Sequence, residues 1–290
     1  MGSALGGSRG TSHVARSGSV QGKVVAITGG ARGIGYSTAE RLLADGAKVA
    51  IGDIDAQRLK EAVGDLGITA YAHLDVTDPD SFESFLDHVE DVLGPIDVLV
   101  NNAGIMPIGS FDAEPDTVTR RMVEINVLGV MFGSKLALQR MLPRKSGHII
   151  NIASLAGESY VPGGATYCGT KHAVKGFTES LRREYRGSGV DFSQVMPTFT
   201  NTELVAGTGG SKGIRNAEPE EIADAVASLI VSPKPRVRVT RLAGSLVASQ
   251  AFLPRAITEP LGRALGLEST FTTAVDNSAR QAYEDRARNA

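Results

Sequence analysis

Seven short apolar runs, separated by stretches with helical periodicity, constrain the fold of this chain more than any other feature. The runs are rich in β-branched residues and partly apolar at consecutive positions, which is typical of parallel strands covered by helices on both faces. The repeated order of strand and helix predicts a doubly wound α/β fold with a parallel seven-stranded sheet. The expected strands are residues 24–28, 48–52, 69–74, 96–100, 148–153, 190–195 and 236–240.

The stretches between these runs show the periodicity and the end signals of helices. Residues 34–46 place apolar side chains at helical spacing and finish at Gly46, a residue typical of helix C-termini. Residues 78–94 begin with Asp78 as an N-cap and Pro79 at the first helical position. No internal repeat or linker interrupts residues 22–240, so we expect one domain there.

A glycine-rich segment, TGGARGIG at residues 28–35, lies between the first strand and the first helix. Glycine lets the backbone turn tightly and approach a phosphate, and the N-terminus of the following helix offers unpaired N–H groups at a positive dipole end. A tight strand-to-helix turn without a ligand would also account for these glycines. Because strand, glycine turn and helix follow in this order, we favour a dinucleotide-binding loop.

Acidic residues after the second and third strands bear on the choice of cofactor. Asp53 is placed to accept hydrogen bonds from the adenosine ribose and to repel a 2′-phosphate. Arg32 points the other way, since a cation in the glycine loop could pair with that phosphate. The carboxylate lies nearer, so we expect NAD, with NADP less favoured. Asp53 and Asp55 also compete as helix caps, and Asp75 either bonds the adenine or forms a turn with Thr77.

The segment ATYCGTKHAVKGF, residues 165–177, holds a tyrosine and a lysine four residues apart. On a helix Tyr167 and Lys171 share one face, about 6 Å apart along the axis. The ammonium would lower the pKa of the phenol from its usual value of about 10, as a general base for an alcohol requires. Ser154, at a strand end, can hydrogen-bond the substrate oxygen. Alone, each would equally fit an amphipathic tyrosine or a helix cap.

Cys168 and His172 are the other reactive side chains of this segment. Each is next to a catalytic candidate, so it points to another part of the helix. No base is placed to activate Cys168, and His172 has no second ligand at metal spacing. We therefore interpret both as packing or surface residues and expect no metal site.

These residues give the chain a resemblance to the short-chain dehydrogenase/reductase family in its single-domain form. The matching motifs are TGGARGIG at 28–35, NNAG at 101–104, Asn126 in EINVLG, Ser154 in NIAS, and Tyr167 with Lys171 in YCGTK. The resemblance covers residues 22–240 and implies a Rossmann-like fold, a nicotinamide cofactor and a catalytic set of Asn126, Ser154, Tyr167 and Lys171. In that set Asn126 holds a water that relays protons to Lys171, and Lys171 bonds the nicotinamide ribose.

The resemblance also implies which residues contact cofactor and substrate. After the sixth strand the family usually has Pro-Gly and later a threonine, whereas this chain reads MPTFTNTEL, with Thr198 in place of the glycine. Thr202 matches the threonine, and Thr200 competes with it. The expected cofactor contacts are Gly29, Arg32, Gly33, Ile34, Gly35, Asp53, Asp75, Val76, Asn102, Ala103, Gly104, Tyr167, Lys171, Pro197, Thr200 and Thr202. The expected substrate contacts are Ser154, Tyr160 and Tyr167.

The segments after the sixth strand are expected to surround the substrate. Residues 203–216 are glycine-rich and poorly periodic, which favours a mobile lid. Residues 241–290 are expected to form a C-terminal helical extension that caps the pocket or covers a subunit interface. A membrane surface is the less favoured partner, because the charges of residues 251–290 nearly balance. The expected apolar pocket includes Met106, Ile108, Leu155, Tyr160, Phe199 and part of the extension.

Bulk properties exclude some function classes. A net charge of −2 favours neither nucleic acid nor an anionic membrane as a partner. The single cysteine excludes an internal disulfide and fits a reducing compartment, so we expect a cytoplasmic protein. No apolar run approaches the ~20 residues of a transmembrane helix. Residues 1–21 lack the apolar core of a secretory signal and are expected to be a disordered tail.

Together these features predict an NAD-dependent oxidoreductase that interconverts a small, apolar secondary alcohol and its ketone. An NADP-dependent carbonyl reductase is one alternative. A nucleotide-sensing binding protein without turnover is another, although the complete catalytic set speaks against it. The resemblance further implies a homo-oligomer, a dimer or tetramer, with the long helices at residues 115–141 and 165–187 as contact surfaces.

Overall fold

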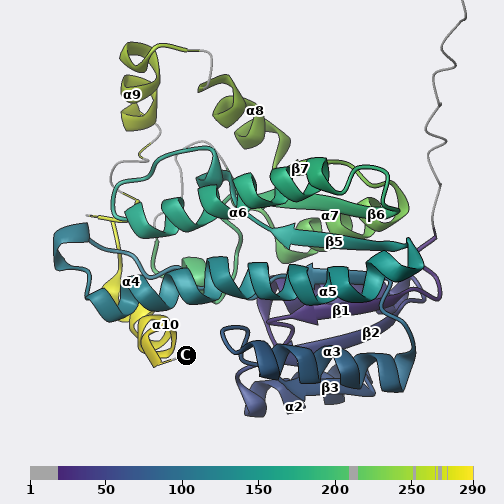
Figure 1. Ribbon diagram of the computed structural model, residues 1–290. Helices are drawn as coiled ribbons and strands as arrows, with labels where there is room; N and C mark the ends of the chain where they lie inside the picture. Colours follow the sequence, from purple (N-terminus) through teal and green to yellow (C-terminus); the bar gives the residue numbers. More distant parts are fainter. Residues whose placement is uncertain are drawn as a thin grey trace, which may run out of the picture.

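A sheet of seven strands, all parallel, forms the centre of the computed structural model, which describes residues 19–208, 215–250, 253–264, 266, 270–272 and 274–289 (Figure 1). The predicted fold class is confirmed, and every expected apolar run overlaps a strand. The strands are β1 (Val24–Thr28), β2 (Lys48–Asp53), β3 (Ala70–His73), β4 (Val98–Asn101), β5 (Gly147–Ile152), β6 (Val190–Pro197) and β7 (Arg236–Val239). Most of the expected N-terminal tail and residues 209–214 of the expected lid lie outside the described residues.

The strand order is β3-β2-β1-β4-β5-β6-β7. The chain therefore builds outward from β1 in one direction and, after crossing over, outward from β4 in the other. Between β1 and β4 the connections leave the sheet toward opposite faces, and open α/β sheets bind their ligands in the crevice at this point.

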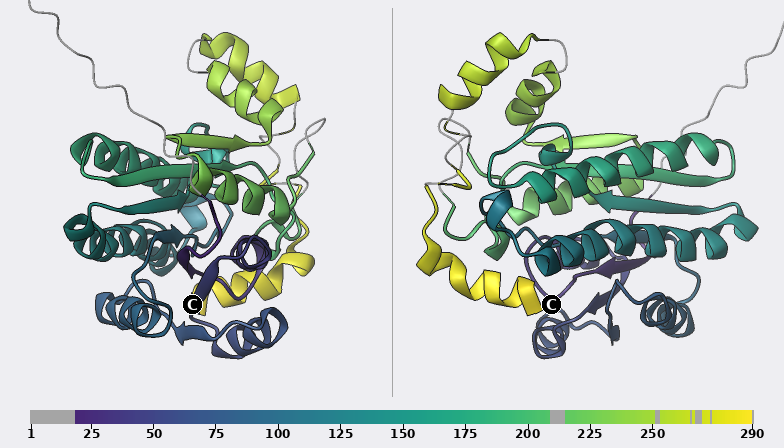
Figure 2. Two further views of the ribbon diagram at one scale, coloured as in Figure 1. Left: turned by 90° about the vertical axis from the view of Figure 1, so that its right-hand side faces the viewer. Right: turned by 60° about the vertical axis from the view of Figure 1, so that its left-hand side comes forward.

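Helices cover both faces of the sheet (Figure 2). One face carries α1 (Gly33–Ala44), α2 (Ala56–Leu66) and α7 (Pro219–Val231), and the other carries α3 (Pro79–Leu93), α5 (Val130–Arg144) and α6 (Ala165–Glu184). Alternate strand residues enter two cores: Ala26 packs in the cluster that holds Phe82, while Ile27 packs in the cluster that holds Leu42. Both faces of each strand are buried, which explains why the strands read as continuous apolar runs.

The predicted helix ends are confirmed where the sequence signals were strong. Asp78 caps α3 by accepting a hydrogen bond from the Asp80 N–H at 3.0 Å, and Pro79 is the first helical residue. Gly46 follows α1 with a φ of +82°. Asp55, rather than Asp53, caps α2, which leaves the Asp53 side chain to other partners.

The expected helix at residues 115–141 is one continuous helical stretch with an irregular centre. It consists of α4 (Asp116–Val123), a π-helical segment, η2 (Glu124–Gly129), and α5. The π turn contains Asn126. Such widened turns are rare and occur frequently at functional sites, because they rotate a side chain out of the regular helical register.

In the part of the chain described after β7, the structure contains three helices: α8 (Arg241–Gln250), α9 (Arg255–Ala264) and α10 (Asn277–Asn289). Figures 1 and 2 show α8 and α9 standing away from the sheet, whereas α10 lies beside α4. The short segments η1 (Phe111–Ala113), η3 (Leu155–Gly157) and η4 (Glu203–Val205) belong to loops at the carboxyl edge of the sheet. Among the helices of the described residues, none combines the length and the apolar character needed to cross a membrane.

Candidate active site

The carboxyl ends of the strands open into one large cavity. It has a volume of about 830 Å³ and extends from the glycine loop after β1, past the ends of β4 and β5, to α8 and α10. All of the expected cofactor contacts line it except Gly35. The expected substrate contacts Ser154, Tyr160 and Tyr167 line the same cavity.

Two glycines explain why the loop after β1 has its shape. Gly29 has a φ of +64°, and a Cβ at this position would lie 2.9 Å from the Ala103 Cα. Gly35 does not reach the cavity; a Cβ there would lie 2.1 Å from the Gly29 carbonyl oxygen, so its role is to let α1 begin close against the turn. Gly33 and Ile34, in the first turn of α1, line the cavity. A helix N-terminus behind a glycine turn fits the pyrophosphate of a dinucleotide.

Asn102 fastens the glycine loop to the end of β4. Its amide nitrogen donates to the carbonyl oxygens of Thr28 and Gly29, both at 2.9 Å. The backbone N–H groups of Asn102 and Ala103 both donate to the Thr28 hydroxyl at 3.0 Å. The NNAG motif thus connects the end of β4 to the start of the glycine loop through four hydrogen bonds.

Asp53 lies at the end of β2, where its carboxylate lines the cavity and is almost fully buried. It accepts hydrogen bonds from the N–H groups of Ala31 and Asp55, both at 3.0 Å. Arg32 is paired elsewhere: its guanidinium bonds the Asp55 carboxylate and lies 3.2 Å from Glu203. Its charge is therefore compensated by two carboxylates of the protein.

Asp75 adopts the turn that was one of its two predicted roles. One of its carboxylate oxygens accepts from the Thr77 N–H at 2.9 Å and from the Thr77 hydroxyl at 2.7 Å. Asp75 and Val76 nevertheless line the cavity at the end of β3, on the adenosine side of the expected cofactor site.

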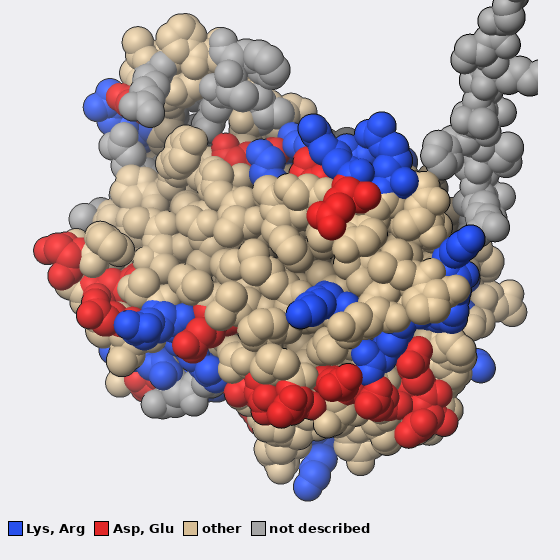
Figure 3. All heavy atoms as spheres, in the orientation of Figure 1, with Lys and Arg blue, Asp and Glu red and all other residues tan. Residues whose placement is uncertain are grey.

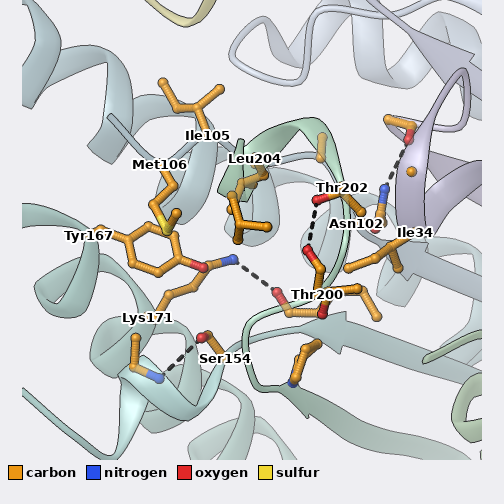
Figure 4. A pocket seen from close by; sticks show the side chains of 18 of the residues that line it. Ile34, Asn102, Ile105, Met106, Ser154, Tyr167, Lys171, Thr200, Thr202 and Leu204 are labelled. Carbon is orange, nitrogen blue, oxygen red and sulfur yellow. Dashed lines mark hydrogen bonds between the residues drawn. The ribbon is translucent and has the colours of Figure 1, made fainter. Parts of the chain in front are cut away.

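Ser154, Tyr167 and Lys171 converge on one space at the centre of the cavity (Figure 4). Tyr167 and Lys171 come from the first turns of α6, and the Lys171 amino group lies 5.7 Å from the centre of the Tyr167 ring. That amino group donates to the Ile152 carbonyl at 3.0 Å, at the end of β5. Ser154 lies two residues after the end of β5 and hydrogen-bonds the Tyr167 phenol.

The proton affinities of this group differ from the expectation for Tyr167. Burial raises the pKa of Tyr167 to about 12, against a smaller lowering by the hydrogen bond from Ser154. Burial also lowers the pKa of Lys171 to about 8. Helical spacing suggested that the Lys171 ammonium would lower the pKa of Tyr167, and that expectation was wrong because desolvation by burial is the largest influence on each group.

Asn126 lies at the π turn and is fully buried, but it does not line the cavity. Its side chain accepts from the Ile105 N–H and donates to the Ile105 carbonyl, both at 2.9 Å. It also donates to the Thr170 hydroxyl at 3.2 Å. The side chain therefore joins the loop after β4 to α6, close behind Lys171.

The loop after β6 covers the glycine loop. Pro197, Thr200 and Thr202 line the cavity, and Thr202 lies over Gly33, whose Cβ would be 3.3 Å from the threonine methyl group. Thr202 donates to the Thr200 carbonyl at 3.3 Å, and Thr200 donates to the Thr198 carbonyl at 3.1 Å. Both threonines remain candidates for the nicotinamide end of a cofactor.

The apolar end of the cavity was predicted in part. Met106, Leu155, Tyr160 and Phe199 line it as expected. Ile108 does not: the loop after β4 turns away beyond Met106, and the Ile108 N–H donates to Glu284 on α10 at 3.4 Å. Tyr160 is 80% exposed, so it lies at the mouth of the cavity, where its ring stacks on His172 at 5.4 Å.

Several lining residues were not identified from the sequence. The expected lid and C-terminal extension do contribute to the cavity, but these individual residues of them were not named: Leu204, Val205, Leu246, Val247, Phe271, Tyr283 and Ala287. Phe271 meets Phe199 edge to face at 5.4 Å. The rough helical spacing of the extension was the available signal, and it indicated helices without indicating which side faces the cavity.

Arg280 attaches α10 to the rest of the site and is fully buried. Its guanidinium donates to the carbonyl oxygens of Leu204 at 2.9 Å and Ala206 at 3.1 Å, to the Met106 carbonyl, and to Glu284 at 2.6 Å. One side chain therefore joins α10 to the loop after β4 and to the loop after β6.

Cys168 and His172 take the secondary roles that the sequence indicated. Cys168 is buried in a hydrophobic cluster, and burial raises the pKa of its thiol. His172 bonds the Cys168 carbonyl through Nδ1 at 2.8 Å. Neither side chain lines the cavity.

The family model for short chain dehydrogenases matches residues 23–213. An uncharacterized oxidoreductase of Staphylococcus saprophyticus is 39% identical over 189 residues, which cover 64% of this chain and 77% of that protein. A 3-alpha-(or 20-beta)-hydroxysteroid dehydrogenase of Mycobacterium tuberculosis is 36% identical over 189 residues, covering 65% and 73%.

A third relative matches more of this chain. The probable oxidoreductase EphD of Mycobacterium tuberculosis is 32% identical over 258 residues, which cover 81% of this chain but 44% of that protein. The chain therefore spans less than half the length of EphD.

Proposed function

Since the chain belongs to the short chain dehydrogenase family, and so is an NAD(P)-dependent oxidoreductase of CH–OH groups, we propose that it uses NAD and interconverts an apolar secondary alcohol and its ketone. The observation that carries this proposal is the convergence of Ser154, Tyr167 and Lys171 in a cavity that continues to Asp53. The cavity thus joins a proton-transfer group to a dinucleotide site.

The residues divide the chemistry among them. A bound nicotinamide would supply or accept the hydride. Tyr167 gives its proton to the carbonyl oxygen during reduction and takes the proton of the alcohol during oxidation. Ser154 donates a hydrogen bond to the same oxygen and stabilises its developing charge. Lys171 carries a positive charge beside the phenol. Asn126 holds the loop after β4 and α6 together through its hydrogen bonds to Ile105 and Thr170.

The pKa values of Tyr167 and Lys171 affect ketone reduction and alcohol oxidation differently. With a pKa of about 12, Tyr167 is protonated at neutral pH and is ready to donate to a ketone. Lys171, with a pKa of about 8, is mostly protonated at pH 7 and favours the phenolate that oxidation requires. We therefore expect the rate of alcohol oxidation to rise with pH more steeply than the rate of ketone reduction.

The proposed mechanism is tested by the Tyr167→Phe variant. It should keep NAD binding, measured by calorimetry, and lose at least about 100-fold in turnover, the usual contribution of a positioned acid or base. Tyr185→Phe, a change to a tyrosine that packs on Phe192 outside the cavity, is the matched control. Activity is followed as NADH absorbance across steroid, terpene and retinoid alcohols.

Two results would contradict the proposal. Near-wild-type turnover by Tyr167→Phe would show that another group transfers the proton. Tight NAD binding by the wild type without oxidation of any alcohol would favour a nucleotide-sensing protein.

The preference for NAD is supported by the charges around the adenosine end. Asp53 presents a buried carboxylate at the expected adenosine end of the cavity, and Arg32 is already paired with Asp55 and Glu203. Repulsion between the carboxylate and a phosphate disfavours NADP.

The kcat/KM ratio for the two cofactors tests this preference. We expect the wild type to have the higher kcat/KM with NAD. Asp53→Asn should lower the ratio of kcat/KM with NAD to kcat/KM with NADP by on the order of tenfold, since one charge is removed while an acceptor oxygen remains. Asp45→Asn, at the far end of α1, is the control and should leave the ratio unchanged. A strong NADP preference in the wild type would contradict the assignment and show that Arg32 dominates.

The apolar end of the cavity supports an apolar substrate. Met106, Leu155, Phe199, Leu246 and Phe271 line it. The relative from Mycobacterium tuberculosis that is named for hydroxysteroids supports fused-ring alcohols as the first compounds to assay.

We also propose that the chain forms a homo-oligomer through the face made by α5 and α6. In Figure 3 this face is broad and carries few charged side chains along its centre. Light scattering coupled to size-exclusion chromatography should give a mass above 30.4 kDa. A monomeric mass at micromolar concentration would contradict this proposal.

A further inference from the structure

Tyr283 is a polar side chain that α10 brings to the apolar end of the cavity. Its phenolic oxygen accepts a hydrogen bond from the Met106 N–H at 2.7 Å. Burial raises the pKa of Tyr283, and the nearby phenol of Tyr167 adds to the rise. Tyr167 and Tyr283 line the same cavity, and Tyr283 keeps its proton.

The hydroxyl proton of Tyr283 is available to a ligand. A phenol offers one donor in addition to its acceptor capacity, and Met106 uses the acceptor side. No acceptor for this proton is found within the parts of the chain that the structure describes. Tyr283 lines the cavity, so this donor is open to an acceptor on a bound ligand.

The position of this hydroxyl is fixed by its surroundings. The Arg280 guanidinium lies 4.8 Å from the centre of the Tyr283 ring and is itself held by the Leu204 and Ala206 carbonyls. A donor held in place before binding loses little entropy when a ligand arrives, so its hydrogen bond contributes to affinity.

The reacting oxygen does not need this donor. In a ketone the two lone pairs of the carbonyl oxygen are taken by Tyr167 and Ser154, and in an alcohol one lone pair and the proton are taken by the same two groups. A further donor at Tyr283 therefore matches a different atom of the substrate.

We propose that Tyr283 donates a hydrogen bond to a second oxygen of the substrate, so that the enzyme prefers apolar alcohols that carry another oxygen function. This inference rests on the proposed dehydrogenase function and adds a specificity-determining residue to it. Tyr283 selects the substrate, whereas Ser154, Tyr167 and Lys171 carry out the reaction.

The test compares alcohols that differ by one oxygen. The probes are cyclohexanol against cyclohexane-1,4-diol, and androstan-3-ol against androstane-3,17-diol, each titrated calorimetrically into the 290-residue protein saturated with NADH. NADH cannot accept a hydride from an alcohol, so affinity is measured without turnover. Failure of the proposed function would appear as missing turnover with NAD, and it would not change this measurement.

The wild type should bind the doubly oxygenated member of at least one pair about three- to tenfold more tightly, the contribution of one net hydrogen bond. Tyr283→Phe should bind the diol and the mono-alcohol with equal affinity, and its affinity for the mono-alcohol should stay within about twofold of the wild-type value. Tyr71→Phe, on β3 and outside the cavity, should keep the ratio. The proposal is overturned if the wild type shows no preference, or if Tyr283→Phe weakens both members equally.

The ligand can be changed in place of the protein if Tyr283→Phe does not fold. An ether oxygen accepts hydrogen bonds but cannot donate them. If Tyr283 is the donor, 4-methoxycyclohexanol or the 17-methyl ether of the steroid diol should keep the preference over the mono-alcohol. The assignment would be overturned if, in the pair whose diol binds more tightly, the methyl ether bound no more tightly than the mono-alcohol.

Discussion

Replacing Arg280 by lysine should release α10 from the site without unfolding the domain. Arg280 makes hydrogen bonds to three carbonyl oxygens and to Glu284 from a fully buried position. A lysine amino group keeps the charge, but a single nitrogen cannot reach carbonyls of both the loop after β4 and the loop after β6. Losing two hydrogen bonds from a charged donor costs about 3 kcal/mol, at about 1.5 kcal/mol each.

This free energy should appear as local opening of α10. A loss of about 3 kcal/mol increases the population of the undocked helix on the order of 100-fold. Hydrogen exchange followed by mass spectrometry should show faster exchange in residues 277–289, with unchanged exchange in β1 and β4. The variant should also bind substrate less tightly, since Tyr283 and Ala287 move with the helix.

Arg286→Ala is the matched control for this experiment. Arg286 also joins α10 to the loop after β6, through Glu203, but its side chain is 43% exposed. An exposed ion pair contributes about 0–1 kcal/mol, so the exchange of α10 should change by less than about fivefold. Unchanged exchange in Arg280→Lys, or an equal effect of both variants, would refute the reasoning.

Three further predictions concern other parts of the molecule. Burial opposes the ionisation of Glu158, but hydrogen bonds from Arg238 and Lys175 outweigh it and lower the pKa from 4.5 to about 2. The stability from this carboxylate is therefore present above pH 4.5 and lost as pH falls toward 2, and the Tm of Glu158→Gln should depend less on pH in that window. Gly35→Ala should lose NAD affinity and stability, because its Cβ would lie 2.1 Å from a carbonyl oxygen, whereas Gly64→Ala, with nothing within 4 Å, should leave both intact. Cys168→Ala should keep full turnover and lose about 1 kcal/mol of unfolding free energy, measured by urea denaturation; lost turnover would show that the thiol takes part.

Local sequence signals predicted the features that depend on neighbouring residues. The order of apolar runs predicted the sheet, and Asp78 with Pro79 predicted the start of α3. The glycine segment and the strand ends predicted the cofactor side of the cavity, because parallel strands bring their carboxyl ends to one edge whatever the details of packing.

The errors arose where the outcome depends on burial or on the direction of a loop. Ile108 was expected in the apolar pocket, but the loop after β4 turns toward α10 beyond Met106. The pKa of Tyr167 was expected to fall because Lys171 is four residues away, yet burial of the phenol raises it to about 12. Spacing along a helix fixes which side chains are neighbours, but it contains no information on how much water they retain.

The sequence by itself determined the order of the strands and helices, the glycine turn and the identity of the catalytic candidates, because these follow from periodicity and backbone geometry. The tertiary structure decided that α10 forms a wall of the cavity, that Arg280 anchors it and that Tyr283 faces the substrate space. The reason is that each of these contacts joins segments about 75 to 180 residues apart, and hydrogen bonds between such distant groups leave no periodic signal in the chain. The pairing of Arg32 with Glu203 was decided in the same way, and it strengthens the expectation of NAD that Asp53 first raised.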